Sequence, residues 1–236
     1  MRISARIASI RLETPTVKSF VLDLEGHTLG FRAGQWVDLF VCLKGSEAVA
    51  GFSITSSPMN QERIGLAVKL IGDNPATHYM HKLARIGDYV EVQLGGEFYY
   101  TDEVSESIVL IAGGIGLTPL MSMMHYVDEA VNSTEIVLIY SAATPLELLF
   151  RDQLDAIAFR NPRVRCIYTI TRPDNTTPGT WDGYVGRIDR DLLNWAKVDL
   201  TAPYYVCGPP PMIRDIQALL IGIGVMPERV HYEQWW

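Results

Sequence analysis

The sequence predicts two domains: an antiparallel β-barrel of Greek-key type, followed by an α/β domain with a doubly wound parallel sheet. Short strand-like segments fill residues 1–101, whereas strand-like and helix-like segments alternate through residues 102–236. The acidic segment 102–107 lies where this rhythm changes. Many short strands without helical spacers are typical of small barrels, and alternation indicates parallel strands joined by helical crossovers.

Six segments of the first domain are rich in Val, Ile and aromatic residues and are separated by Gly and Pro. We expect strands at 2–11, 17–24, 35–43, 51–55, 64–70 and 89–94. One short helix is expected over 78–84. Its N-cap is expected to be Thr77, because a threonine hydroxyl can accept a hydrogen bond from the first helical turn.

The second domain is expected to alternate regularly after its acidic start. Strands are predicted at 108–112, 135–140, 164–171, 204–207 and 230–233, and helices at 118–131, 145–158, 189–196 and 210–221. In such a sheet, ligands bind outside the carboxyl ends of the strands.

Composition excludes several classes of protein. The chain is 48% hydrophobic and 20% charged, which suits an ordinary folded core. Three widely spaced cysteines, Cys42, Cys166 and Cys207, make neither a disulfide framework nor a metal site. No apolar stretch has the length and composition of a membrane span or a signal core. We expect a cytoplasmic protein that binds no metal, with an organelle matrix as the alternative if an upstream targeting segment is missing.

The net charge of −7 is unevenly distributed. Residues 1–101 hold ten basic and ten acidic residues, so the whole excess of acid falls on 102–236. An acidic chain argues against general binding of nucleic acids. The neutral first half is where an acidic protein partner would dock more easily, although an ordinary solvated surface is the simpler interpretation.

A glycine-rich loop, Ala112-Gly113-Gly114-Ile115-Gly116-Leu117-Thr118-Pro119, follows the first strand expected in the second domain. Glycines let the main chain approach a pyrophosphate, and N–H groups at a helix start attract anions. We expect Gly113, Gly114 and Gly116 to hold a dinucleotide, with Thr118 capping the helix and donating to a phosphate oxygen. A tight turn that needs glycine for its shape is the alternative.

A second loop, Cys207-Gly208-Pro209-Pro210-Pro211-Met212, also follows a strand and opens a helix. Proline is acceptable at a helix start. We expect this loop to present N–H groups at the same sheet edge, with Gly208, Pro209 and Met212 near the ligand. The small thiol of Cys207 suits contact with a nicotinamide ring, and inert packing is the alternative. The chain is therefore expected to handle hydrides.

Two other segments are candidates for contact with a flat redox ring. In Gly51-Phe52-Ser53-Ile54-Thr55, the aromatic ring can lie against a flavin while the serine hydroxyl reaches its N5. Taken by itself, this segment favours Phe52 in the barrel core. The chain ends in Glu233-Gln234-Trp235-Trp236, and two exposed tryptophans are costly. They are expected to cover the domain interface or to stack on a flavin.

In this order, the segments resemble the ferredoxin–NADP reductase superfamily over essentially the whole chain. Matching pieces also include Phe31-Arg32-Ala33-Gly34-Gln35-Trp36-Val37, Val68-Lys69 and Gly95-Gly96-Glu97-Phe98. Within the superfamily the chain is similar to the oxidoreductase NAD-binding domain-containing proteins. That similarity rests on the Phe-Ser-Ile strand, Gly95–Phe98, Glu147-Leu148-Leu149-Phe150 and the Glu-x-Trp-Trp end.

The resemblance implies an FAD-binding barrel, 1–101, and an NAD(P)-binding domain, 102–236. Flavin contacts are implied for Phe52, Ser53, Ile54, Thr55, Val68, Lys69, Thr77, Trp235 and Trp236. Nucleotide contacts are implied for Gly113, Gly114, Gly116, Thr118, Arg172, Cys207, Gly208, Pro209 and Met212. Catalytic roles are implied for Ser53 near flavin N5, Cys207 at the reacting carbon, Glu233 as a proton carrier and Trp236 as a cover for the flavin.

One departure from the family pattern concerns the flavin phosphates. Ala50 stands where the superfamily has an arginine, and Phe52 replaces a tyrosine. Loss of a charged hydrogen bond would weaken binding by roughly 1.5–3 kcal/mol. Loosely bound FAD, FMN in its place, or compensation by Lys69 are all open.

The nucleotide is expected to be NADPH. Thr171-Arg172 follows the third strand of the second domain and resembles the Ser-Arg pair of plant-type members, and a 2′-phosphate requires a cation. The alternative is that Arg172 is a solvated loop residue.

The predicted function is a flavin-dependent reductase that transfers a hydride from NAD(P)H to FAD and then electrons to an external acceptor. A small molecule or an acidic, ferredoxin-like redox protein is the expected acceptor. Two alternatives are open: an electron-transfer subunit of a larger complex, and a nucleotide-binding module that has lost tight flavin binding.

Overall fold

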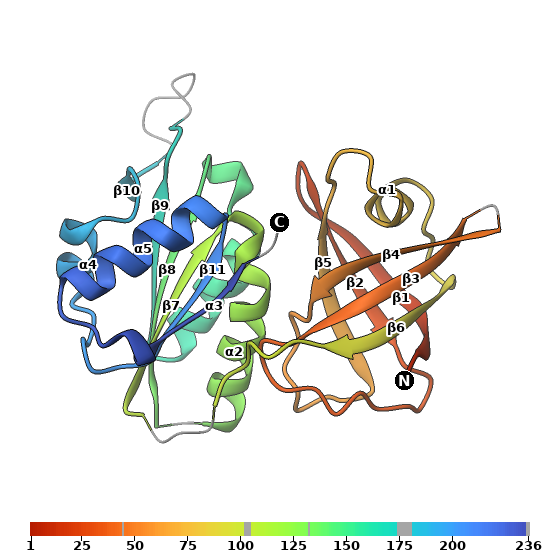
Figure 1. The fold of residues 1–236 in the computed structure, drawn as a ribbon, viewed down its shortest axis with the longest axis horizontal. Coiled ribbons are helices and arrows are strands. Elements are labelled where there is room, and N and C mark those ends of the chain that lie inside the picture. Colours follow the sequence, from red (N-terminus) through yellow and green to blue (C-terminus); the bar gives the residue numbers. More distant parts are fainter. Residues whose placement is uncertain (44, 102–104, 132, 174–180, 235–236) are drawn as a thin grey trace. The chain divides into compact units, whose positions relative to one another are not determined.

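The computed structural model describes residues 1–236 apart from 44, 102–104, 132, 174–180 and 235–236. The chain divides into two compact units (Figure 1). The first comprises residues 1–101 together with 121–130, and the second comprises 102–120 together with 131–236.

The first unit is a six-stranded antiparallel sheet in the order β4-β3-β6-β1-β2-β5. An isolated antiparallel bridge pairs Ile54, the residue after β4, with Leu66 of β5, the other outer strand. Its strands are β1 (Ile3–Thr14), β2 (Val17–Asp23), β3 (Trp36–Leu43), β4 (Ser46–Ser53), β5 (Arg63–Lys69) and β6 (Tyr89–Gly95). Alternate residues of these strands, such as Ile64, Leu66 and Val68, are buried in one apolar core. The predicted barrel is therefore confirmed.

The short helix of this unit begins earlier than the sequence analysis predicted. Helix α1 (Pro75–Lys82) packs against β3, β4 and β5. Its N-cap is Asn74, whose side chain accepts hydrogen bonds from the N–H groups of Ala76 and Thr77. The expectation that Thr77 caps the helix is wrong, because an Asn followed by Pro makes the stronger start signal.

The second unit is a parallel sheet in the order β10-β9-β8-β7-β11-β12. Its strands are β7 (Ser107–Gly113), β8 (Glu135–Ala142), β9 (Val164–Ile170), β10 (Tyr184–Val185), β11 (Tyr204–Gly208) and β12 (Val230–Gln234). Its helical elements are η1 (Gly114–Gly116), α2 (Leu117–Ala130), η2 (Pro145–Glu147), α3 (Arg151–Arg160), α4 (Arg190–Ala196), α5 (Pro210–Gly222) and η3 (Pro227–Arg229). Residues Met121–Ala130 of α2 belong to the first unit.

Helices cover both faces of this sheet (Figure 1). Buried residues of α4 and α5 share a core with Ile167 and its neighbours. The next side chains along β9 face α3, since Cys166 contacts the Leu154 carbonyl and the Tyr168 hydroxyl donates to Asp155 at 2.6 Å. The predicted doubly wound α/β arrangement is confirmed.

The helix expected over 145–158 is interrupted. Only η2 and α3 are helical, and Phe150 between them has a φ of 56°. The buried Tyr140 hydroxyl accepts a hydrogen bond from the Leu149 N–H and donates to the Glu147 carbonyl. Leu148, Leu149 and Phe150 are buried by this break, so burial overrides helical continuity. In addition, β4 begins five residues before the predicted strand, and β10 was not predicted.

None of the helices in the described part of the chain is long and apolar enough to cross a bilayer.

Candidate active site

The order of strands in the second unit fixes where a ligand would bind. From β7, the chain adds β8, β9 and β10 on one side and later places β11 and β12 on the other. The order in which the chain adds strands therefore reverses between the neighbouring parallel strands β7 and β11, where Ala112 pairs with Cys207. A crevice at such a switch point is the usual ligand site of open α/β sheets. Both loops singled out from the sequence lie at this point.

In the glycine loop, a ligand can approach the backbone closely at Gly114. It begins η1 with a φ of 54°, and a Cβ built on it would meet nothing within 4 Å. The first N–H groups of a helix have no partner within that helix, and they attract anions. Gly114 and the N–H groups after it therefore fit a pyrophosphate.

Gly113 and Gly116 are glycines for a different reason. A Cβ on Gly116 would overlap the Cys207 carbonyl, and a Cβ on Gly113 would overlap the Met212 sulfur. Gly208 in turn approaches the Gly113 backbone, at 3.1 Å from a built Cβ to Cα. The two loops are thus locked against each other through residues without side chains. At Gly113 and Gly116, the structure agrees with the alternative in which the turn needs glycine for its shape.

Thr118 lies inside the helix. Helix α2 begins at Leu117, and the Thr118 hydroxyl donates to the Ile115 carbonyl at 2.9 Å. The expectation that Thr118 caps the helix is therefore wrong. Its proton is used within the loop, so the phosphate role predicted for Thr118 would require a change of hydrogen-bond partner.

The proline loop has a different chemistry from that expected. Pro209 is the N-cap of α5, and Pro210 and Pro211 are its first two residues, so this helix start has lost three N–H groups. The expectation that the second loop offers N–H donors to a phosphate is wrong for these positions. Pro209 and Met212 instead form a stiff apolar surface beside Gly113, which suits contact with a ring.

Cys207 is fully buried in β11, with β7 on one side and β12 on the other. Burial raises the pKa of its thiol, and the Glu233 carboxylate, opposite it in the register, raises the pKa further. The thiol is therefore neutral at physiological pH. Such a group contributes shape and polarisability rather than nucleophilic attack. Glu233 is half-buried on β12.

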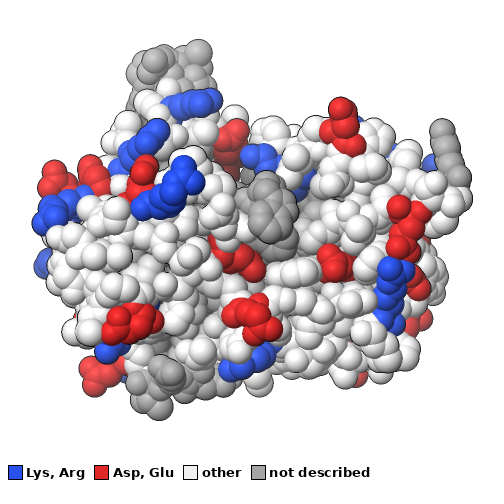
Figure 2. All heavy atoms as spheres, in the orientation of Figure 1, with Lys and Arg blue, Asp and Glu red and all other residues white. Residues whose placement is uncertain are grey.

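Arg172 lies just beyond the carboxyl end of β9 and is exposed, with its N–H bonded to the Ala143 carbonyl at 2.7 Å. Basic side chains of the second unit gather near the ends of β9 and β10 in the view of Figure 2. Trp235 and Trp236, assigned to flavin contact from the sequence, lie outside the described residues.

In the first unit, Ser53 ends β4. It is 5% exposed, and its hydroxyl has no hydrogen-bond partner among the described residues. Because none of the fully buried side-chain oxygens in the described residues lacks a partner, this hydroxyl keeps access to solvent, and a ligand acceptor could reach it. This hydroxyl therefore fits the role predicted for it beside a flavin ring.

Phe52 points the other way from Ser53, because neighbouring residues of a strand face opposite sides. It pairs with Val37 and belongs to the apolar core. Ala50, two residues earlier on the same face, packs against that core. The alternative that placed Phe52 in the core agrees with the structure, and flavin contact by Phe52 stays a prediction.

The remaining predicted flavin contacts divide into core and surface. Ile54 and Val68 are buried in the core, and Thr55 is 8% exposed, with its N–H bonded to the Gly65 carbonyl. Lys69 is exposed at the end of β5. These four assignments stay predictions.

The start of α1 offers little to a phosphate. Pro75 has no N–H, Asn74 takes those of Ala76 and Thr77, and the His78 N–H bonds to the Asn74 carbonyl. The Thr77 hydroxyl donates to the Asn74 carbonyl at 3.1 Å. A pyrophosphate at this helix end would have to displace the cap. The occupied start of α1 is thus a second feature, besides Ala50 in place of an arginine, that leaves the flavin phosphates fewer partners.

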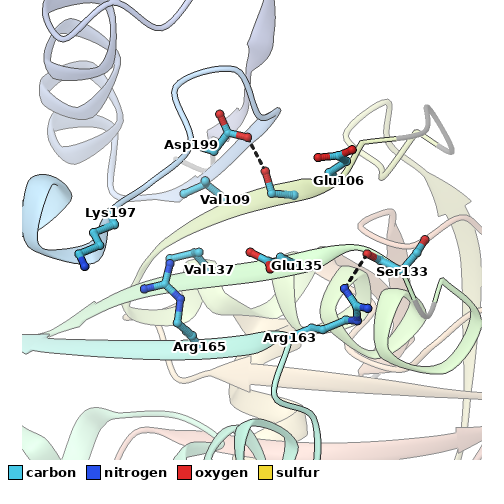
Figure 3. Close-up of a pocket in the computed structure, with 10 residues that line it drawn as sticks. Glu106, Val109, Ser133, Glu135, Val137, Arg163, Arg165, Lys197 and Asp199 are labelled. Atoms are coloured by element: carbon cyan, nitrogen blue, oxygen red, sulfur yellow. Dashed lines mark hydrogen bonds between the residues drawn. The ribbon is translucent and has the colours of Figure 1, made fainter.

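A separate cavity of about 470 Å³ lies at the amino ends of β7, β8 and β9 (Figure 3). Arg163, Arg165 and Lys197 line it, together with the carboxylates of Glu106, Glu135 and Asp199. Asp199 accepts a hydrogen bond from Ser107 at 2.8 Å. The lining thus carries three basic and three acidic side chains. It lies at the opposite strand ends from the glycine loop.

Across the described residues, no group of three His, Cys, Asp or Glu side chains is placed to hold a metal ion. Asn74 was not predicted as the cap of α1, although Asn-Pro before a helix is a recognisable start signal. Trp36, which pairs with both Ser53 and Gly95, was assigned no role from the sequence.

Comparisons with known proteins agree with this arrangement. The oxidoreductase FAD-binding domain family matches residues 4–100, and the oxidoreductase NAD-binding domain family matches residues 110–218. The chain is thus made of an FAD-binding and an NAD-binding domain.

Individual relatives match nearly the whole chain. Oxidoreductase NAD-binding domain-containing protein 1 of Danio rerio is 34% identical, over 99% of this chain and 92% of the relative. The toluate 1,2-dioxygenase electron transfer component of Pseudomonas putida is 30% identical, over 98% of this chain and 67% of the relative. A ferredoxin NADP⁺ reductase from Neisseria gonorrhoeae shares the fold, with a TM-score of 0.82 at 21% identity over 100% and 99% of the two chains. The chain shares its fold with the ferredoxin NADP⁺ reductase, and it belongs to the oxidoreductase NAD-binding domain-containing protein 1 family.

Proposed function

We propose that this chain is an NAD(P)H-dependent flavoprotein reductase that passes electrons to an external acceptor. The observation that carries the proposal is the buried Cys207 thiol at the β7–β11 switch point, locked beside the glycine loop. The family adds an FAD-binding domain to the same chain. Bound flavin would supply the chemistry, by accepting a hydride as a pair of electrons and releasing the electrons to the acceptor.

The residues of the chain are proposed to orient the nucleotide and the flavin and to exclude water from the site. Gly114 and the following N–H groups hold the nucleotide pyrophosphate, and Cys207 with the apolar proline loop positions the nicotinamide ring. The Ser53 hydroxyl donates to the flavin ring near N5. Glu233 carries a proton, and Trp235 or Trp236 covers the flavin until nicotinamide replaces it.

Variants at the two proposed ring contacts test this function. Ser53→Ala and Cys207→Ala should lower turnover with NAD(P)H and a dye acceptor by about ten-fold, with less effect on flavin affinity. Ser46→Ala at the exposed start of β4 and Cys42→Ala at an exposed cysteine are matched controls. Loss of flavin binding with unchanged turnover per bound flavin would contradict the assigned roles.

The proposed nucleotide is NADPH, with the exposed Arg172 on its 2′-phosphate. Arg172→Ala should lower kcat/KM for NADPH by about ten-fold or more and leave NADH unchanged, because a charge-assisted hydrogen bond is lost. A preference for NADH that this variant does not alter would refute the assignment.

A second candidate is an electron-transfer subunit of a larger complex, which the relation to the toluate dioxygenase component favours. Purification from the native cell distinguishes it by copurifying subunits. A third candidate, a module without flavin, is favoured by Ala50 and by the occupied start of α1. Colourless protein that cannot be reconstituted with FAD or FMN would support that third candidate.

A further inference from the structure

Three residues lie side by side across the ends of three strands in the first unit. Trp36 of β3 pairs with Ser53 of β4 on one side and with Gly95 of β6 on the other. The strands are neighbours in the sheet (Figure 1). Directly opposed residues of antiparallel strands project to the same face, with Cβ atoms roughly 4.5–5.5 Å apart. The side chains of Trp36 and Ser53 therefore project from the same face of the sheet.

The indole is held flat by the glycines beside it. A Cβ built on Gly95 would lie 2.7 Å from Trp36 Cη2, and one on Gly96 would lie 2.6 Å from Cδ1. The two rings of the indole thus lie along the backbone of both residues, where no side chain fits. The Gln35 amide donates to the Gly96 carbonyl at 2.8 Å and fixes that backbone. Trp36 is half-buried, so part of its ring is accessible.

Phe52 cannot provide this surface. It pairs with Val37, which is fully buried, and it packs into the core on the face opposite Ser53. The aromatic surface on the side of the Ser53 hydroxyl is therefore Trp36. A fixed ring on the same face as a hydroxyl without a protein partner suits a flat heterocycle with a polar edge.

We propose that Trp36 is the aromatic contact of the isoalloxazine ring in this chain, and that Gly95 and Gly96 hold its indole in place. The proposal rests on the proposed flavoprotein function. It assigns the recognition of the ring to the row Ser53–Trp36–Gly95. The flavin phosphates then contribute less, in agreement with Ala50 and the occupied start of α1.

Equilibrium titration of the full-length apoprotein with FAD and with riboflavin tests the proposal. Trp36→Leu should weaken binding of both by about ten-fold, and Trp36→Phe by about three-fold, because a smaller ring retains part of the contact. Bound flavin should fluoresce more strongly in both variants, because the indole that quenches it is gone. Trp195→Leu, at a tryptophan 69% exposed on α4, is the control and should change neither quantity.

Gly95→Ala provides a second variant that keeps the tryptophan. Its backbone φ is outside the left-handed region, so the added methyl group acts by pushing the indole away. It should weaken flavin binding about as much as Trp36→Leu, while thermal unfolding monitored by circular dichroism shows that each variant is folded. Unchanged affinity and quenching in folded Trp36→Leu would overturn the proposal and leave the proposed function standing. Wild-type protein that binds no flavin would contradict both.

Discussion

At the scale of single residues, burial determines which side chains are chemically available. Cys207 and His81 are both buried, and each is held in its neutral form. Asn74 occupies the N–H groups that a phosphate would use. Ser53 is the contrasting case, since its hydroxyl has no partner among the residues that the structure describes. Among these polar groups, the Ser53 hydroxyl is therefore the one that can donate to a ligand without first losing a protein partner.

Thiol modification should distinguish the exposed Cys42 from the buried Cys207 by their reactivity. Cys42 is exposed, whereas burial raises the pKa of Cys166 to about 12 and the pKa of Cys207 above its usual range. Because the thiolate is the reacting form, iodoacetamide at neutral pH should alkylate Cys42 and spare Cys207. Mass spectrometry of digested protein measures this. Alkylation of Cys207 at the rate of Cys42 would contradict its neutral, buried state.

His81 should make the first unit less stable in acid. Burial is the main cause that lowers its pKa below 6.5, and Lys18 and Lys82 lower it further, although Nε2 lies 2.8 Å from the Val68 carbonyl. Below about pH 6.5 the unfolded chain binds a proton that the folded chain resists, so stability falls as the pH falls.

Urea unfolding at pH 7.5 and pH 5.5 measures this effect. His81→Gln keeps a donor for the Val68 carbonyl and should show a smaller loss of stability between these pH values. His27→Gln, at an exposed histidine, should behave as the wild type does. An identical pH dependence in His81→Gln and wild type would exclude His81 as the cause.

At the scale of elements, the candidate nucleotide site is formed by two loops with different chemistry. The glycine loop has an open N–H edge at Gly114, whereas the proline loop has lost three donors and presents a stiff apolar surface. The loops contact each other through Gly113, Gly116 and Gly208. A phosphate and a ring could thus be held side by side at one sheet edge.

Alanine variants of the glycine loop separate its two functions. Gly116→Ala should lower the free energy of unfolding by about 1–3 kcal/mol, since its Cβ overlaps the Cys207 carbonyl. Gly114→Ala meets no atom and should cost about 1–2 kcal/mol through its positive φ, with a larger loss of NAD(P)H affinity. Urea unfolding and nucleotide titration measure both. Wild-type stability in Gly116→Ala would contradict the contact between the loops.

At the scale of the whole molecule, the barrel and the α/β domain could both be predicted from the sequence. Most of their strands and helices have a recognisable hydrophobic pattern and recognisable end residues. Tertiary contacts decided the failures. The helix predicted over 145–158 is interrupted after η2 because the Tyr140 hydroxyl bonds to the backbone and the next three residues are buried. The strand predicted at 51–55 begins earlier, as β4, because the polar Ser46 and Glu47 pair with β3. The pairing of Trp36 with Ser53 depends on a register that no local pattern gives.

Part of the candidate site was predictable for similar reasons. The glycine and proline loops are marked by residue types that few other structures need, and both lie at the switch point. The sequence could not show that Gly113 and Gly116 face the other loop, or that three prolines remove the donors expected there. Those outcomes depend on contacts between segments about ninety residues apart.

The central claim is that this family member moves a hydride from nicotinamide to flavin. Anaerobic rapid mixing of flavin-loaded protein with NADPH, and separately with NADH, tests it most directly through the visible absorption of oxidised flavin. We expect at least one nucleotide to bleach this absorption, and Cys207→Ala to bleach about ten-fold more slowly than Cys42→Ala. Persistent absorption, with both flavin and nucleotide bound, would contradict it.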